Sequence, residues 1–115
     1  MKVIYICGAY RNKDVYQVWN NIQLARVYAI EVWKMGHVAL CPHTNSAFFE
    51  GAATSEQFLE GTKELLRRCD AVMVCPNFEN SEGSKGEIEL AGLLNIPVFY
   101  ELEELNQWLM SISLI

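Results

Sequence analysis

Short, continuously apolar segments alternate along this chain with longer segments of helical periodicity, and this alternation restricts the folds open to it. The apolar segments are residues 2–7, 37–41, 71–75 and 96–100. Each is too short for a stable helix and is typical of a strand buried on both faces. Gly8, Pro42 and Pro76 follow the first three segments directly, which is where such strands end.

The segments between these strands predict helices, because their apolar residues recur at steps of three and four. The expected helices span residues 14–35, 54–69, 84–94 and 103–110. Asn12 or Asp14 can cap the first helix and Gly36 can end it, while Thr54 can cap the second. Residues 43–53 have no sustained period, which predicts a long loop.

Strands that alternate with helices predict right-handed βαβ units. We therefore expect an α/β fold of the flavodoxin-like or Rossmann-like type, with three layers, helices on both faces, and a parallel sheet of four or five strands in the order 2-1-3-4. The length of 115 residues fits one domain, residues 1–115. Ligands of such sheets bind beside the carboxyl ends of the strands, so the loops after Cys7, Cys41 and Cys75 are the expected binding region.

Charge and composition exclude several classes of function. The formal net charge is −5, with five basic and four acidic residues over 1–57, and four basic and ten acidic residues over 58–115. This balance disfavours binding to a nucleic acid polymer. No apolar run approaches the length of a membrane span or a signal peptide, which predicts a cytoplasmic protein without a membrane partner.

The loop that follows the first strand reads Gly8-Ala9-Tyr10-Arg11 and leads into a helix. A glycine there allows close approach of a ligand, the helix start offers free N–H groups, and an arginine suits phosphate or carboxylate. The same pattern also fits a plain strand-to-helix turn with a solvated arginine. Neither a dinucleotide fingerprint nor a Walker A motif is present.

The third crossover contains Ser81, Gly83 and Ser84 ahead of Glu87 on the expected helix. The serines and glycine predict a second cradle for a small anion, with the Glu87 carboxylate at the mouth of the cleft. An equally good interpretation is structural, because Ser84 and Glu87 have the spacing of a capping box.

Taken together, the segments Tyr5-Ile6-Cys7-Gly8-Ala9-Tyr10-Arg11, Asp70 to Val74, Ser81-x-Gly83-x-x-x-Glu87-x-x-x-Ala91 and Ile96-Pro97-Val98 resemble the nucleoside 2-deoxyribosyltransferase superfamily, which includes the 2'-deoxynucleoside 5'-phosphate N-hydrolases. The resemblance covers most of the chain. It implies cleavage or transfer at the N-glycosidic bond of a nucleoside or nucleoside 5'-monophosphate, without a metal or organic cofactor.

The resemblance also implies residue roles. Glu87 would be the nucleophile at the anomeric carbon, as in retaining glycoside cleavage, and Tyr5 would orient it. The residues expected to bind substrate are Gly8, Ala9, Tyr10, Arg11, His43, Ser81, Gly83 and Ser84. His43 could reach the base or the sugar edge, although a single loop histidine is more often polar surface.

One position departs from the superfamily pattern: Thr62 stands where an aspartate usually assists protonation of the leaving base. A threonine cannot act as a general acid at neutral pH. Three interpretations stay open: a purine that leaves readily and needs little help, a substitute such as Glu79 or Glu82, or a catalytically inactive protein that binds a nucleotide.

Two further hypotheses rest on the cysteines and on the aromatic residues. Cys7, Cys41 and Cys75 at strand ends, with His43 nearby, could form a metal or redox site, but buried reduced cysteines are favoured. Trp19, Tyr28 and Trp33 on the first helix suggest a surface that pairs with a second copy, so a homodimer or larger homo-oligomer is expected.

Overall fold

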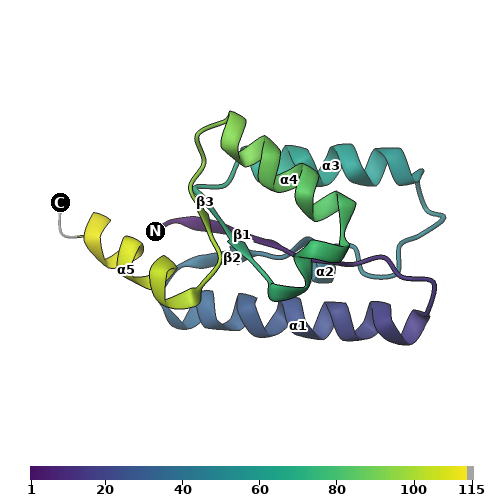
Figure 1. The fold of residues 1–115 in the computed structure, drawn as a ribbon, viewed down its shortest axis with the longest axis horizontal. Helices are drawn as coiled ribbons and strands as arrows, with labels where there is room; N and C mark the ends of the chain where they lie inside the picture. The colour runs from purple at the N-terminus through teal and green to yellow at the C-terminus, as the bar shows by residue number, and fades with distance from the viewer. Residues whose placement is uncertain (114–115) are drawn as a thin grey trace.

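The computed structural model describes residues 1–113 and contains the expected parallel sheet (Figure 1). Its strands are β1 (Val3–Cys7), β2 (Val38–Leu40), β3 (Ala71–Val74) and β4 (Val98–Phe99). They are ordered β2-β1-β3-β4, and every neighbouring pair is parallel, with Tyr5 of β1 in register with Leu40 of β2 and Val72 of β3. The predicted fold class and strand order are confirmed, with four strands among the described residues.

Helices cover both faces of this sheet. They are α1 (Val15–Lys34), α2 (Pro42–Asn45), α3 (Ser55–Arg67), the 3-10 helix η1 (Pro76–Asn80), α4 (Glu82–Leu93) and α5 (Leu102–Ile112). Figure 1 shows α1 and α5 on one face and α3 and α4 on the other. One core cluster accordingly joins β1 and β3 to α1 and α5, and a second joins the same strands to α3 and α4.

The central strands are buried because both of their faces lie under helices. Tyr5 and Cys7 belong to the core cluster under α3 and α4, whereas Ile4 and Ile6 belong to the cluster under α1 and α5. This alternation explains why the segment is continuously apolar instead of alternating with polar residues. It also turns the Tyr5 hydroxyl towards α3 and α4.

Three of the predicted helix ends are confirmed. The Asp14 side chain accepts a hydrogen bond from the Tyr16 N–H at the start of α1, and the Thr54 side chain accepts one from the Gln57 N–H at the start of α3. After α1, Gly36 adopts a left-handed backbone with a φ of 86°, a conformation that glycine adopts without steric cost.

Other local features differ from the sequence-based expectation. Residues 43–53 do not form one long loop, since Pro42 opens the short helix α2 and an isolated bridge joins Glu50 to Ala53. Helix α4 begins at Glu82 instead of Ser84, because its cap is Ser81, whose hydroxyl accepts from the Ser84 N–H. None of the described helices combines the length and apolar character that crossing a bilayer requires.

Candidate functional site

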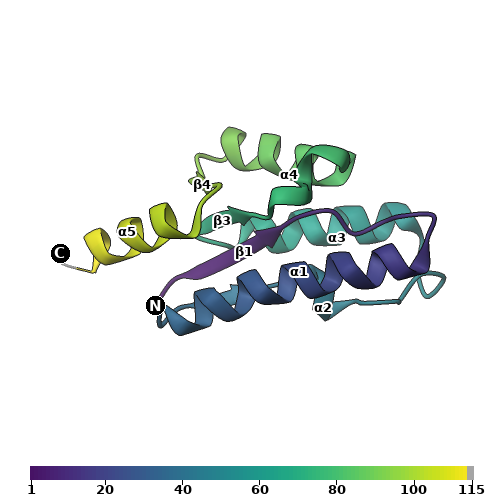
Figure 2. The ribbon, with the colours of Figure 1, turned by 60° about the horizontal axis from the view of Figure 1, so that its bottom comes forward.

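A cavity of about 860 Å³ lies at the carboxyl ends of the strands. Its walls come from the end of β1 and the loop after it, the start of α1, α2 and the segment that follows, α3, and the start of α4. Figures 1 and 2 show the N-terminal ends of α1, α3 and α4 at this one end of the sheet. Segments far apart in the sequence therefore meet at the position where parallel sheets bind ligands.

Glu87 and Tyr5 face each other in this cavity. The Tyr5 hydroxyl on β1 donates a hydrogen bond to Glu87 Oε2, in the second turn of α4. Burial, followed by the charge of Glu87, raises the pKa of Tyr5 well above its ordinary value, so the phenol keeps its proton and remains a donor. The carboxylate is thereby held by a buried group on the central strand.

A thiol supports the other oxygen of the same carboxylate. Cys7 Sγ lies 3.6 Å from Glu87 Oε1 and 3.6 Å from the Ser84 carbonyl oxygen. Burial raises the pKa of Cys7 far above its usual range, with the charge of Glu87 adding to the effect, so the sulfur is a protonated donor and not a reactive thiolate.

The environment of Glu87 is unusual for a carboxylate. Burial raises the pKa of Glu87, while hydrogen bonds from Tyr5 and Cys7 oppose this shift. The positive charge of Lys63, which also lines the cavity, acts in the same direction as these hydrogen bonds. A partly desolvated carboxylate with fixed donors on both oxygens is oriented and available for reaction with a ligand.

The loop after β1 is held in place by three polar side chains. His43 Nε2 lies 3.0 Å from the Gly8 carbonyl oxygen and 3.0 Å from the Ala9 carbonyl oxygen, and since both partners are acceptors this nitrogen carries the proton. Asn77 Oδ1 accepts from the Ala9 N–H, and Asn21 Nδ2 donates to the Tyr10 carbonyl oxygen. The loop therefore has a fixed shape next to Glu87.

His43 is buried and does not belong to the polar surface. Burial lowers the pKa of His43, which keeps the ring neutral. Its second nitrogen, Nδ1, is buried as well and has no hydrogen-bond partner among the described residues, and the same holds for the Ser84 hydroxyl. Both side chains line the cavity.

Gly8 is required by close packing within the protein. A Cβ at this position would lie 2.9 Å from the Cβ of Cys75 and 3.1 Å from Asn77 Oδ1. The end of β1 thus approaches the segment after β3 more closely than a larger residue allows. The sequence predicted that the small residue serves close approach of a ligand, whereas its nearest neighbours are Cys75 and Asn77.

A carboxylate that no sequence motif indicated, that of Glu50, also lies in the cavity wall. The Tyr10 hydroxyl donates to Glu50 Oε1 at 2.6 Å and accepts from the Phe48 N–H at 2.9 Å. Phe48 has a φ of 59°, in the left-handed region that residues other than glycine seldom adopt. This contact fastens the segment after α2 to the loop after β1, two segments without a common motif in the sequence.

The structure brings most of the predicted site residues to this cavity. Those that line it are Tyr5, Gly8, Tyr10, Arg11, His43, Ser81, Gly83, Ser84 and Glu87. Ala9 is buried beside the cavity and does not line it. The capping-box interpretation of Glu87 is wrong, because Ser81 caps α4 and the Glu87 side chain bonds to Tyr5.

Residues considered as substitutes for a missing acid occupy different places. Thr62, the position that lacks the acid, lines the cavity; its hydroxyl donates to the Leu59 carbonyl oxygen within α3, and its hydrogen bond to Glu87 also opposes the rise in the pKa of Glu87 that burial causes. Glu82 is in the wall and Glu79 is not. Asn21, Asn77 and Glu50 were not selected from the sequence, and Cys7 was considered only for a metal or redox site; a polar residue at a buried helix position was the available signal for Asn21.

The cysteines do not form a metal centre in the described part of the chain. Among residues 1–113, no three histidine, cysteine or acidic side chains are grouped closely enough to hold a metal ion. Cys7, Cys41, Cys69 and Cys75 are free thiols in the core. The metal hypothesis that joined Cys7, Cys41, Cys75 and His43 is therefore not supported.

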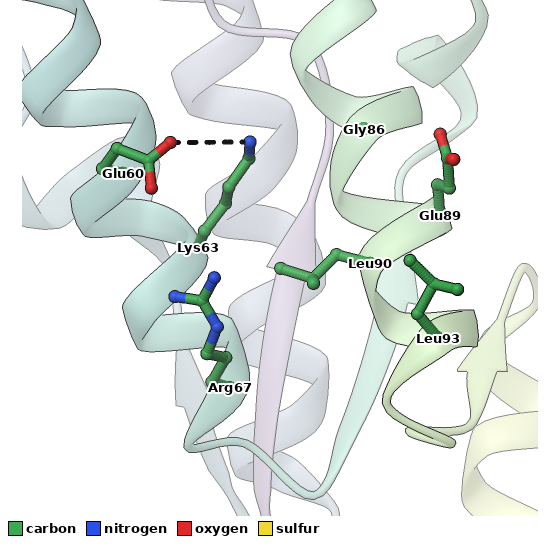
Figure 3. Close-up of a pocket in the computed structure, with 7 residues that line it drawn as sticks. All are labelled: Glu60, Lys63, Arg67, Gly86, Glu89, Leu90 and Leu93. Atoms are coloured by element: carbon green, nitrogen blue, oxygen red, sulfur yellow. Dashed lines mark ion pairs between the residues drawn. The ribbon is translucent and has the colours of Figure 1, made fainter.

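A second, shallower hollow lies between α3 and α4 and is drawn in Figure 3. Its volume is about 400 Å³, and it shares Lys63 and Gly86 with the larger cavity. Lys63 lies 3.8 Å from Glu60 in an exposed ion pair on α3, and Glu89 lies across from them on α4 (Figure 3). We refer to this hollow as the α3–α4 groove.

Comparison with solved structures relates the fold to that of an enzyme. Seven chains of known structure match it. One is a 2-deoxyribosyltransferase from Bacillus psychrosaccharolyticus, with a TM-score of 0.60 and 16% sequence identity over 84% of this chain and 69% of that one. At this identity the likeness shows a common fold.

The family itself is identified from the sequence. Residues 2–101 match the family described as "Domain of unknown function (DUF7768)", and the chain belongs to this family. No curated protein matches the sequence significantly.

Proposed function

We propose that this protein cleaves or transfers the N-glycosidic bond of a nucleoside or nucleoside 5'-monophosphate, with Glu87 as the nucleophile. The observation that carries the proposal is the Glu87 carboxylate, held by Tyr5 and Cys7 inside a cavity of about 860 Å³. A nucleotide-sized ligand fits a cavity of this volume. The fold likeness to a 2-deoxyribosyltransferase agrees with this chemistry. The proposal treats residues 1–115 as one domain of this type.

The reaction would proceed in two steps. In the first, a Glu87 oxygen attacks the anomeric carbon, the bond from that carbon to the base nitrogen breaks, and the base leaves with the electron pair and takes a proton from water. In the second, water or another base attacks the anomeric carbon and releases Glu87 as a carboxylate. The acceptor, whether water or the N–H of another base, releases its proton to the solvent.

The surrounding residues have supporting roles in this proposal. Tyr5 and Cys7 orient the carboxylate, so that less freedom is lost when it meets the sugar. Gly8, Tyr10, Arg11, Ser81, Gly83 and Ser84 are assigned to binding the sugar and its substituents. Arg11 offers a guanidinium suited to a phosphate.

One observation favours a second candidate, a nucleotide-binding protein without turnover. Thr62 lines the cavity, and its side chain is a threonine hydroxyl, which is not acidic near neutral pH and offers no proton to a leaving base. Such a protein would bind the same ligands and release no base.

Incubation with a panel of ribo- and deoxyribonucleosides and their 5'-monophosphates separates the two candidates. Free base is measured by chromatography, with and without an added acceptor base, for the wild type, Glu87→Ala and the control Glu89→Ala. Glu89 is a suitable control because it is exposed on the same helix and faces the α3–α4 groove. The proposal requires base release by the wild type and the control, and none by Glu87→Ala. Ligands that raise the melting temperature without base release would establish the second candidate.

A further inference from the structure

Helix α1 carries a second apolar face that the fold does not use. Six large apolar side chains on it are exposed: Val15, Tyr16, Trp19, Val27, Ile30 and Trp33. At about 100° of rotation per residue, these side chains fall within an arc of roughly 120° on one side of the helix. Gln23 and Arg26 interrupt the arc near its middle.

The opposite face of the same helix already supplies the core contacts. Val18, Ile22, Ala25 and Val32 are buried on that side. Tyr28 is partly buried against the same core, so its predicted place beside Trp19 and Trp33 on the exposed surface is wrong. The exposed arc therefore adds nothing to the packing of the chain, and Figure 2 shows no other element lying across the side of α1 that faces the viewer. Trp19 is 51% exposed and Trp33 is 56% exposed, which is unusual for the largest apolar residue type.

The size of this surface fits a protein interface. With about 150–250 Å² of surface on each of the three aromatic side chains and less on the three aliphatic ones, the six residues together still expose on the order of 700 Å². A standard interface buries about 800 Å² on each partner, and aromatic residues are enriched at its centre. The face is thus close to what one stable association requires.

We propose that this face binds the same face of a second copy of the chain, with the two α1 helices antiparallel. The charges at the ends of α1 favour the antiparallel orientation, because Asp14 precedes the first turn of the helix and Lys34 lies in its last turn. An antiparallel pair brings Asp14 of each copy near Lys34 of the other and opposes the two helix dipoles, whereas a parallel pair would align like charges.

The same orientation matches the apolar residues. With the two-fold axis near residues 24 and 25, Trp19 of one copy lies near Ile30 of the other, and Tyr16 lies near Trp33. Gln23 of one copy then lies beside Arg26 of the other. Polar residues therefore contact each other at the centre of the interface, and apolar residues contact each other at both of its ends. Val15 belongs to both this face and the cavity wall, so the second copy borders the mouth of the cavity.

The molar mass in solution tests the proposed surface. We expect the wild type to be a dimer by light scattering coupled to size-exclusion chromatography, and the double variant Trp19→Glu/Trp33→Glu to be a monomer with an unchanged far-ultraviolet circular dichroism spectrum. Leu93→Glu is the matched control, because Leu93 is 75% exposed on α4 and should leave the dimer intact. A monomeric wild type at high micromolar concentration, or a dimer that survives the double substitution, would overturn the proposal.

Cross-linking tests the orientation and does not depend on the double variant. All four native cysteines are buried, so a short bismaleimide reports on an introduced cysteine. In the antiparallel pair the two copies of residue 23 are separated by roughly 5 Å along the helix axis and those of residue 34 by nearly 30 Å. Gln23→Cys should therefore form a covalent dimer and Lys34→Cys should not. Cross-linking of both, or of Lys34→Cys alone, would exclude the antiparallel arrangement.

Discussion

The cavity at the strand ends and the α3–α4 groove share Lys63 and Gly86, yet their walls differ in kind. The cavity contains buried or partly buried polar groups, among them Glu87, His43 and Ser84. The groove is formed by exposed charges, such as Glu60 and Glu89, with leucines between them. Burying a polar group lowers the free energy of unfolding unless the group is paired. The presence of such groups in the cavity is therefore better explained by a function than by stability.

The largest expected effect concerns the nucleophile. Glu87→Ala or Glu87→Gln should reduce base release by a factor on the order of a thousand or more, because no covalent intermediate can form. Ligand binding should persist in the glutamine variant, which keeps the shape of the side chain. Measurement of kcat alongside Kd separates these effects, and an equally large loss in Glu89→Ala would remove the distinction between cavity and groove.

The second effect concerns the loop that shapes the cavity. His43→Ala should lower the free energy of unfolding by about 2–3 kcal/mol, because the Gly8 and Ala9 carbonyl oxygens lose a buried donor. Urea unfolding measures this change. His37→Ala is the matched control, since His37 is only partly buried and accepts one hydrogen bond, from the Lys2 N–H. Similar losses for the two histidines would contradict the special role of His43.

The third effect separates orientation from folding. Tyr5→Phe removes the hydroxyl that donates to Glu87 and should reduce kcat by about 10- to 100-fold while the fold is retained. The acid limb of the pH–rate profile should also shift to higher pH, because the Glu87 carboxylate loses a hydrogen-bond donor that favours its charged form. Tyr100→Phe, on an exposed side chain, should change neither quantity. An unshifted acid limb in Tyr5→Phe would exclude the orienting contact.

The fourth effect is on stability and depends on pH. Because burial raises the pKa of Glu87 in the folded state, ionising this carboxylate disfavours folding as pH rises. Glu87→Gln should therefore melt a few degrees above the wild type near neutral pH. The difference should vanish below pH about 4, where the glutamate is protonated in both the folded and unfolded states. Melting temperatures across this range test the prediction, and a lower melting temperature for the variant at pH 7 would contradict it.

The smallest effect belongs to the groove. Arg67→Ala should change the free energy of unfolding by less than about 0.5 kcal/mol, since Arg67 pairs with Glu64 on an exposed surface. Base release should be unchanged. A loss of activity in Arg67→Ala would show that the α3–α4 groove takes part in the reaction. It would contradict the account in which only the cavity at the strand ends is functional.

Much of the fold follows from local patterns in the sequence. Continuous apolar runs specify buried strands, and Asp14, Gly36 and Thr54 mark helix ends through their own side chains or backbone preferences. The start of α4 was missed because Ser81 and Ser84 are both acceptable caps, and only tertiary packing selects between them. The same choice decides whether Glu87 caps its helix or faces Tyr5.

The site could be predicted only in part, for a similar reason. Tyr5 and Glu87 were predicted from the resemblance of their segments to the nucleoside 2-deoxyribosyltransferase superfamily, whereas the supports of the first loop come from α1, α2 and η1 and have no common pattern. Asn21, His43 and Asn77 meet because the strand order brings their elements together. Glu50 reaches the cavity through Tyr10, a contact between loops that no periodicity specifies.

Intact-mass spectrometry of the protein with a 2-fluorinated nucleoside analogue tests the central claim most directly. The fluorine slows both steps by destabilising positive charge at the anomeric carbon, and a good leaving base restores the first step, so the covalent intermediate accumulates. We predict a mass increase equal to one sugar residue, mapped by peptide analysis to Glu87 and absent from Glu87→Gln. An adduct on another residue, or base release from natural substrates without any adduct, would contradict the role of Glu87 as the nucleophile.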